Sequence, residues 1–261
     1  MGKEELIEKV RNLKARLQLA VSEYDDVELK EATAIRIEYT EKIGQYECQQ
    51  YELYLQFEEL RHKVEMVQAR INRGEEVDIV AIDKEVADIL TSYYEKLNGM
   101  RQDVDEMDRY HSGPEIDVDE RAELKRIYRK LMKILHPDVI DPKLGFDPDL
   151  WEKAQSAYKR NDVDALRMIE DIVGDTVSTP LESKDESELI DMASRIELAI
   201  ARYQMKLDEI RKKFPFTETE HLNNDAWVRA RQAEIKKSIE EYQKSIAFMV
   251  LVLNGLLNQE G

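Results

Sequence analysis

Apolar residues recur at steps of three and four positions along most of this chain, which is the spacing of helices with one buried face. The first such stretch, residues 3–24, predicts a helix that ends where Asp25 and Asp26 break the pattern or cap the next helix. Its predicted buried stripe consists of Leu6, Val10, Leu13, Leu17 and Ala20.

Two longer helices are predicted next. Between residues 29 and 71 the same spacing persists over several heptads, which is typical of a coiled-coil seam, and a second seam covers residues 79–107. The segment between them, residues 72–78, contains Gly74, which we expect to cap the end of the preceding helix. Because the connection is short, the two helices are predicted to form an antiparallel hairpin with the first helix alongside.

Two interruptions divide the pattern. Gly113-Pro114 stops it within residues 110–120, and it is lost again over residues 174–187. In the second gap, Ser183 and Glu186 have the spacing of a capping box. Beyond it, apolar stripes over residues 189–210 and 235–256 predict a second antiparallel hairpin.

The predicted fold is therefore all-α, with long antiparallel helical hairpins or coiled coils on either side of a small helical domain. The predicted segments are an N-terminal arm over residues 1–110, a central domain over 111–175 and a C-terminal hairpin over 183–261.

Composition narrows the classes of function. The net charge of -17 argues against nucleic acid and against an acidic membrane surface as partners. The single cysteine, Cys48, excludes a disulfide framework and a cysteine-based zinc site. The N-terminus has no apolar signal region, so we expect a cytoplasmic protein. The apolar residues 245–257 are too few to span a membrane, and we expect them to pack on the N-terminal hairpin or in a homodimer interface.

The central segment carries an uninterrupted basic helix face. No acidic residue occurs between Leu124 and Leu135, although the chain is acidic overall. A solvated helix face is one interpretation, and a surface that attracts an acidic partner is the other. The basic residues are Lys125, Arg126, Arg129, Lys130 and Lys133.

The basic helix leads into His136-Pro137-Asp138. Proline removes a backbone donor and disfavours helix at the residue before it, so the helix is predicted to end near His136. The histidine and the aspartate are then held at a helix end in a constrained geometry. After a loop, a new helix is expected from about Asp149, with Ala154, Ala157 and Tyr158 on its apolar side.

A basic amphipathic helix that ends in His-Pro-Asp, followed across a loop by "AQSAYKR", resembles the J domain of DnaJ-type co-chaperones. The resemblance covers roughly residues 115–173. It implies docking on a DnaK-type chaperone and stimulation of its ATPase by His136, Pro137 and Asp138 together with the five basic residues above. The helical arms would bind a client or partner protein, and the chain itself would need no cofactor or metal and would not be an enzyme.

The chain departs from the family pattern in several places. The usual short first helix with a Tyr-Tyr-x-x-Leu element is not found before the basic helix; "SYYEKLNGM", residues 92–100, lies inside the long seam. A Gly/Phe-rich linker and cysteine-rich repeats are absent from the sequence. The alternative function is accordingly a coiled-coil scaffold with an inactive J-like module. The histidines His62, His111, His136 and His221 have no metal-binding spacing.

Overall fold

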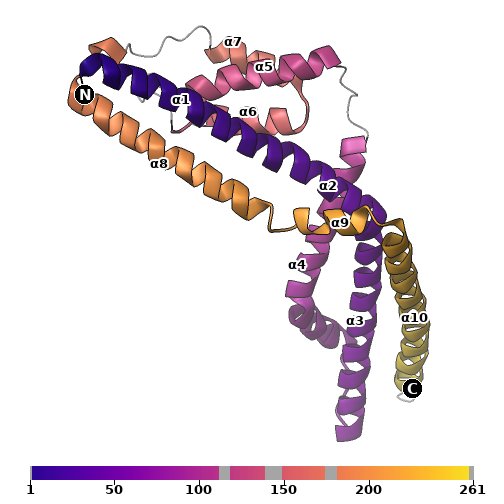
Figure 1. The fold of residues 1–261 in the computed structure, drawn as a ribbon. Coiled ribbons are helices and arrows are strands. Elements are labelled where there is room, and N and C mark those ends of the chain that lie inside the picture. Colours follow the sequence, from indigo (N-terminus) through magenta and orange to yellow (C-terminus); the bar gives the residue numbers. More distant parts are fainter. Residues whose placement is uncertain (1, 112–117, 139–148, 174–180, 259–261) are drawn as a thin grey trace. The chain divides into compact units, whose positions relative to one another are not determined.

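A computed structural model describes residues 2–111, 118–138, 149–173 and 181–258 (Figure 1), and every regular element in these ranges is helical. The fold is all-α, as predicted. The helices before the first gap are α1 Lys3–Asp25, η1 Asp26–Glu31, α2 Ala32–Tyr39, η2 Thr40–Gly44, α3 Gln45–Arg73 and α4 Ile79–His111. They are followed by α5 Val118–Leu135, α6 Asp149–Lys159, α7 Val163–Val173, η4 Leu181–Ser183, α8 Glu186–Ile210, η5 Phe216–Glu218, α9 Thr219–Leu222 and α10 Asp225–Leu257.

Contacts divide the chain into two units that differ from the predicted segments. The first unit combines residues 1–35 with 112–217, and the second combines 36–111 with 218–261. The predicted boundary after residue 110 lies beside the unit boundary between residues 111 and 112. The predicted boundary at 183 falls inside the first unit, and residues 1–35 belong to that unit as well, because α1 and α8 pack with the central helices rather than with the long hairpin. The break at Gly113-Pro114 and the loop over residues 139–148 lie outside the described residues.

In the first unit, α1 pairs with α8, and the two helices run in the same direction. Near their starts, the Lys3 ammonium donates to the Glu182 carbonyl at 2.9 Å, just before α8 begins. Near their ends, the rings of Tyr24 and Tyr203 meet edge to face with centroids 5.5 Å apart. This parallel pair was not predicted, because a hydrophobic stripe defines a face of a helix but not its partner or direction.

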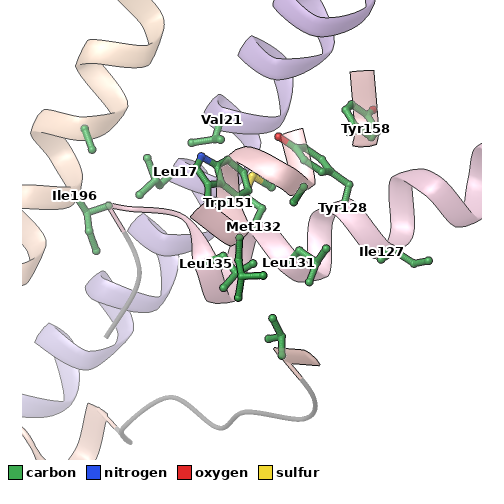
Figure 2. Packing of buried hydrophobic residues seen from close by; sticks show 14 of the residues in the cluster. Leu17, Val21, Ile127, Tyr128, Leu131, Met132, Leu135, Trp151, Tyr158 and Ile196 are labelled. Carbon is green, nitrogen blue, oxygen red and sulfur yellow. The ribbon is translucent and has the colours of Figure 1, made fainter. Parts of the chain in front are cut away.

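One hydrophobic core joins the α1–α8 pair to α5, α6 and α7. Figure 2 shows Leu17 and Val21 of α1, Trp151 of α6 and Ile196 of α8 around the apolar face of α5. Burying a large aliphatic or aromatic side chain contributes about 1.5–3 kcal/mol, so this shared core is the main stabilising term of the unit. Its α5 members are Leu124, Ile127, Tyr128, Leu131, Met132 and Leu135.

The predicted interruption at Asp25 and Asp26 is wrong. Helical backbone continues from α1 into the π-helical turn η1, where the amide of Ala32 bonds to the carbonyl of Val27 five residues before. The two aspartates do not cap a helix, because their carboxylates accept hydrogen bonds from tyrosines of α5 and α6.

A second correction concerns the start of α8. Ser183 ends the short turn η4 and does not cap the helix. The N-cap is Asp185, whose carboxylate accepts from the Glu188 amide at 2.8 Å, while the Glu188 carboxylate accepts from the Asp185 amide at 2.9 Å. The capping box therefore lies two residues later than predicted.

In the second unit, α3 and α4 form the predicted antiparallel hairpin. Arg70 near the end of α3 pairs with Glu85 near the start of α4 at 2.9 Å. Gly74 caps α3 in the left-handed conformation with φ 68°, which confirms the predicted cap.

Helix α10 lies along α3 in the same direction, so α8 and α10 do not form the predicted second hairpin. Arg231 near the start of α10 pairs with Glu47 near the start of α3 at 2.8 Å, and Tyr242 meets Tyr54 further along, with centroids 5.9 Å apart. The connection between α8 and α10 contains helical turns of its own, η5 and α9, so it is not the tight turn that would impose an antiparallel return.

Helix α3 has two contact faces, where the heptad pattern predicted one seam. Leu53, on the predicted seam, packs against the cluster that contains Ile235 and Ile239 of α10. Cys48 and Leu55, which lie off that seam, are buried with Leu97 of α4. At the other end of the unit, the apolar end of α10 packs on the hairpin through Leu253, Leu256 and Leu257, which confirms one of the two expectations for this segment.

Candidate functional site

Helix α5 presents one buried and one charged face, as its sequence predicts. The apolar stripe at steps of three and four residues enters the core, and the basic residues stay on the outside. Lys125 lies 3.9 Å from the carboxylate of Asp26 and is half exposed, so this ion pair is weak.

The basic residues do not all remain available to a partner. Arg126 and Lys130 both approach the half-buried carboxylate of Glu170 on α7, at 3.5 and 3.2 Å. No ion pair joins Arg129 or Lys133 to another described residue. Both side chains are exposed and lie one helical turn apart. These two side chains form the cationic row that leads toward the exposed Pro137.

Helix α6 returns antiparallel to α5 and fixes its orientation. The rings of Tyr128 and Tyr158 stack with centroids 4.1 Å apart, and the Trp151 ring also stacks with Tyr128, at 5.6 Å. Ala154 and Ala157 are almost completely buried at this contact, and such small side chains let the two helices approach closely. The residues that carried the resemblance are thus brought together in one packed helix pair.

The turn after α5 is closed by its histidine. The His136 amide still bonds to the Met132 carbonyl at 3.2 Å, and Pro137 then ends the helix. The Asp138 amide donates to Nδ1 of His136 at 3.1 Å, while Nε2 lies 2.9 Å from the Tyr203 hydroxyl on α8. Because Nδ1 accepts, the neutral imidazole carries its proton on Nε2 and donates it to Tyr203.

His136 is only 2% exposed, and its ring meets Trp151 edge to face with centroids 5.1 Å apart. Burial lowers the pKa of His136 from 6.5 to about 4; the nearby Asp138 opposes this shift and Lys206 adds to it. The imidazole is therefore neutral at physiological pH. Its role in this structure is to hold the turn against α6 and α8.

Asp138 is more accessible than the histidine. Its carboxylate lies 3.2 Å from the guanidinium of Arg202 on α8, which is 63% exposed. One turn further along α8, the Lys206 ammonium lies over the rings of Tyr24 and Tyr203, at 5.5 and 5.1 Å from their centroids. Helix α8 thus contacts both the imidazole and the carboxylate of the His-Pro-Asp turn.

A partly buried polar cluster connects the end of α1 and the start of η1 to the α5–α6 pair. The Tyr128 hydroxyl donates to Asp25 at 2.5 Å, and the Tyr158 hydroxyl donates to Asp26 at the same distance. Burial raises the pKa of Asp25 from 3.8 to about 6, although the hydrogen bond from Tyr128 acts in the opposite direction. Burial also lowers the pKa of Lys30 to about 8; its ammonium donates to the Tyr158 carbonyl.

The structure brings His136, Pro137 and Asp138 to the end of the basic helix as the sequence predicts. Sequence reasoning missed the residues of α8 that contact this turn, although Tyr203 lies within the apolar stripe predicted over residues 189–210. It also missed Asp25 and Asp26, which it treated as a break. Their only signal was position: two adjacent acids inside an otherwise uninterrupted helical pattern.

Residues 92–100, which contain the Tyr-Tyr pair, lie in α4 and belong to the second unit. Helix α1 lies against α5 and α6 instead, with Leu17 and Val21 near Trp151 (Figure 2).

Comparisons with known protein families, with curated proteins and with solved structures found no match to this chain. Among the described residues no three His, Cys, Asp or Glu side chains gather as a metal site. Within the same ranges, no helix has both the length and the apolar character needed to cross a membrane.

Proposed function

We propose that this chain is a J-domain co-chaperone that docks on a DnaK-type chaperone and stimulates its ATPase. The observation that carries the proposal is the His-Pro-Asp turn at the end of a cationic helix, clamped by an antiparallel helix through the Tyr128–Tyr158 stack. Basic side chains on a rigid helix attract an acidic partner surface at long range, and a fixed turn provides a specific contact.

The surface offered to the chaperone consists of Arg129, Lys133, Pro137 and Asp138. All four are exposed, and the backbone that carries them is held by the buried face of α5 and by the hydrogen bond from the Asp138 amide to His136. Lys125, Arg126 and Lys130 contribute to the positive field, although part of their charge is offset by Asp26 and Glu170. The second unit would bind a client or partner protein, and the protein would act in the cytoplasm.

The test is single-turnover ATP hydrolysis by a purified DnaK-type chaperone with increasing amounts of the full-length protein. We expect the rate to rise to a plateau. Asp138→Asn should reduce the stimulation about tenfold or more, because it removes a charged group from the contact while conserving its shape. Asp138 is a better target than the buried His136, whose replacement also disturbs packing.

A charge-reversal pair tests the steering role of the helix. Arg129→Glu with Lys133→Glu should raise the concentration needed for half-maximal stimulation and weaken its dependence on salt. The matched control reverses the exposed Lys84 and Lys244 of the second unit, with the same change in net charge. Equal effects of the two pairs would refute a local role for α5.

A helical scaffold with an inactive J-like module is the second candidate. The observation in its favour is the burial of His136 against α6 and α8, which removes this side chain from the surface. Failure of the native protein to accelerate ATP hydrolysis, with the helical content and mass intact, would support the scaffold and exclude the co-chaperone.

A further inference from the structure

We propose that the last turns of α8 form a cover over the His-Pro-Asp turn, and that the chaperone gains access to His136 only when this segment lifts away. This inference rests on the proposed function and adds to it a mode of regulation. The cover consists of Arg202, Tyr203 and Lys206.

The contacts of the cover are directed at the groups that would have to meet a partner. The Tyr203 hydroxyl lies 2.9 Å from Nε2 of His136, and its ring packs on the imidazole with centroids 5.7 Å apart. The Arg202 guanidinium lies 3.2 Å from the Asp138 carboxylate. Both nitrogens of the imidazole are thereby engaged within the chain, and its edge has no free polar atom for another protein.

Burial also limits access to the turn. His136 is 2% exposed, between Trp151 on α6 and Tyr203 on α8. Trp151 belongs to the hydrophobic core of the unit, so it cannot withdraw without disrupting that core. Tyr203 is only half-buried and therefore is the side chain whose removal would expose the histidine.

The packing of α8 allows its end to move separately. The first turns are anchored on α1 by buried apolar residues, and the last fully buried one is Ile200. Beyond it, only Tyr203, Leu207 and Ile210 are half-buried, and the remaining positions up to the helix end are exposed. A segment with few buried contacts opens at lower cost than the core does. The cover can therefore lift while the rest of α8 stays on α1.

The cover is weak enough for a partner to displace. A neutral hydrogen bond such as that of Tyr203 favours the closed state roughly two- to tenfold, and an exposed ion pair such as that of Arg202 adds up to about fivefold. If only the open state binds the chaperone, the apparent affinity is reduced by the fraction of molecules that are open. Loosening the cover should therefore lower the concentration needed for half-maximal stimulation without changing the plateau.

The test is the double variant Tyr203→Phe with Arg202→Gln, studied in the full-length protein. Phenylalanine keeps the ring and removes the hydroxyl, and glutamine keeps the length of the side chain and removes the charge. We expect the half-stimulating concentration to fall roughly tenfold. The matched control is Tyr94→Phe with Arg101→Gln, which removes one hydroxyl hydrogen bond and one exposed ion pair of the second unit that do not involve the turn.

A second readout does not depend on the chaperone. The titration of His136 by NMR reports opening, because the imidazole protonates more readily when it reaches water. A tenfold larger open fraction should raise the apparent pKa of His136 by up to about one unit, and the control should leave it unchanged.

A lower half-stimulating concentration together with the raised histidine pKa supports the cover. Stimulation that is unchanged or weakened in the double variant, with normal stimulation by the native protein, overturns the cover alone. If neither protein stimulates ATP hydrolysis, the proposed function falls, and the regulatory inference falls with it.

Discussion

Replacing Asp25 by asparagine should stabilise this protein at neutral pH, although it removes a hydrogen-bonded carboxylate. Asp25 is 2% exposed and accepts a hydrogen bond from Tyr128 at 2.5 Å. Burial, with smaller contributions from Glu28 and Asp26, raises its pKa from 3.8 to about 6 in the folded state. An asparagine amide has nearly the same shape, and its oxygen can still accept from Tyr128, but it is never charged.

The magnitude follows from linkage between protonation and folding. A rise of about two pKa units at about 1.4 kcal/mol per unit corresponds to about 3 kcal/mol. Because the folded pKa is the higher one, the contribution of Asp25 to stability is complete below about pH 4 and is lost as the pH rises through about 6. Near pH 7.5 the free energy of unfolding of the variant should therefore be up to about 3 kcal/mol higher than that of the native protein. Near pH 3.5 the two free energies should be similar.

The assay is urea unfolding of both proteins at a series of pH values from 3.5 to 7.5. The difference between the two free energies isolates Asp25, because all other titrating groups are common to both proteins. A difference that does not change with pH would refute the assigned pKa. A variant that is less stable than the native protein at pH 7.5 would show that the hydrogen bond to the carboxylate outweighs the cost of its buried charge.

Three further outcomes are expected. The pKa of His136 is lowered to about 4, so its contribution to stability is complete above about pH 6.5 and is lost as the pH falls toward 4. NMR titration should find the imidazole neutral at pH 6, and a titration midpoint near pH 6.5 would contradict its burial. Asp185→Ala should lower the free energy of unfolding by about 1 kcal/mol, whereas Ser183→Ala should change it little, since Asp185 is the N-cap of α8; equal effects would contradict this assignment of the cap. Gly74→Ala should cost about 1 kcal/mol, measured by the same unfolding assay, because φ is 68° at this position; a neutral result would contradict the left-handed cap.

The sequence predicted the helical fold and the helix that carries the candidate site because both depend on local patterns. The amphipathic face of α5, the proline that ends it and the left-handed cap at Gly74 are properties of a few neighbouring residues. The α3–α4 hairpin was also predictable, because a short connection forces neighbouring helices to run antiparallel.

The partners of the remaining helices were not predictable in the same way. The apolar stripes on α1 and α8 show that each helix has a buried face. They do not predict that these two helices, which are far apart in the sequence, pack against each other in parallel. Two faces of α3 are buried, and its heptad pattern described only the one that contains Leu53.

The same limit applies to the site. Nothing in the local sequence of His136 places Tyr203 beside it, and the histidine is buried between Tyr203 and Trp151. Asp25 and Asp26 have the residue types of a helix break, yet long-range hydrogen bonds from Tyr128 and Tyr158 keep them within the helix.

We propose that the turn at the end of α5 acts on the ATPase of another protein. The most direct measurement is the single-turnover rate of ATP hydrolysis by a DnaK-type chaperone, with the native protein compared with Asp138→Asn. We expect a saturable acceleration by the native protein that falls about tenfold or more in the variant. An unchanged rate with the native protein, or the same acceleration by both, would contradict it.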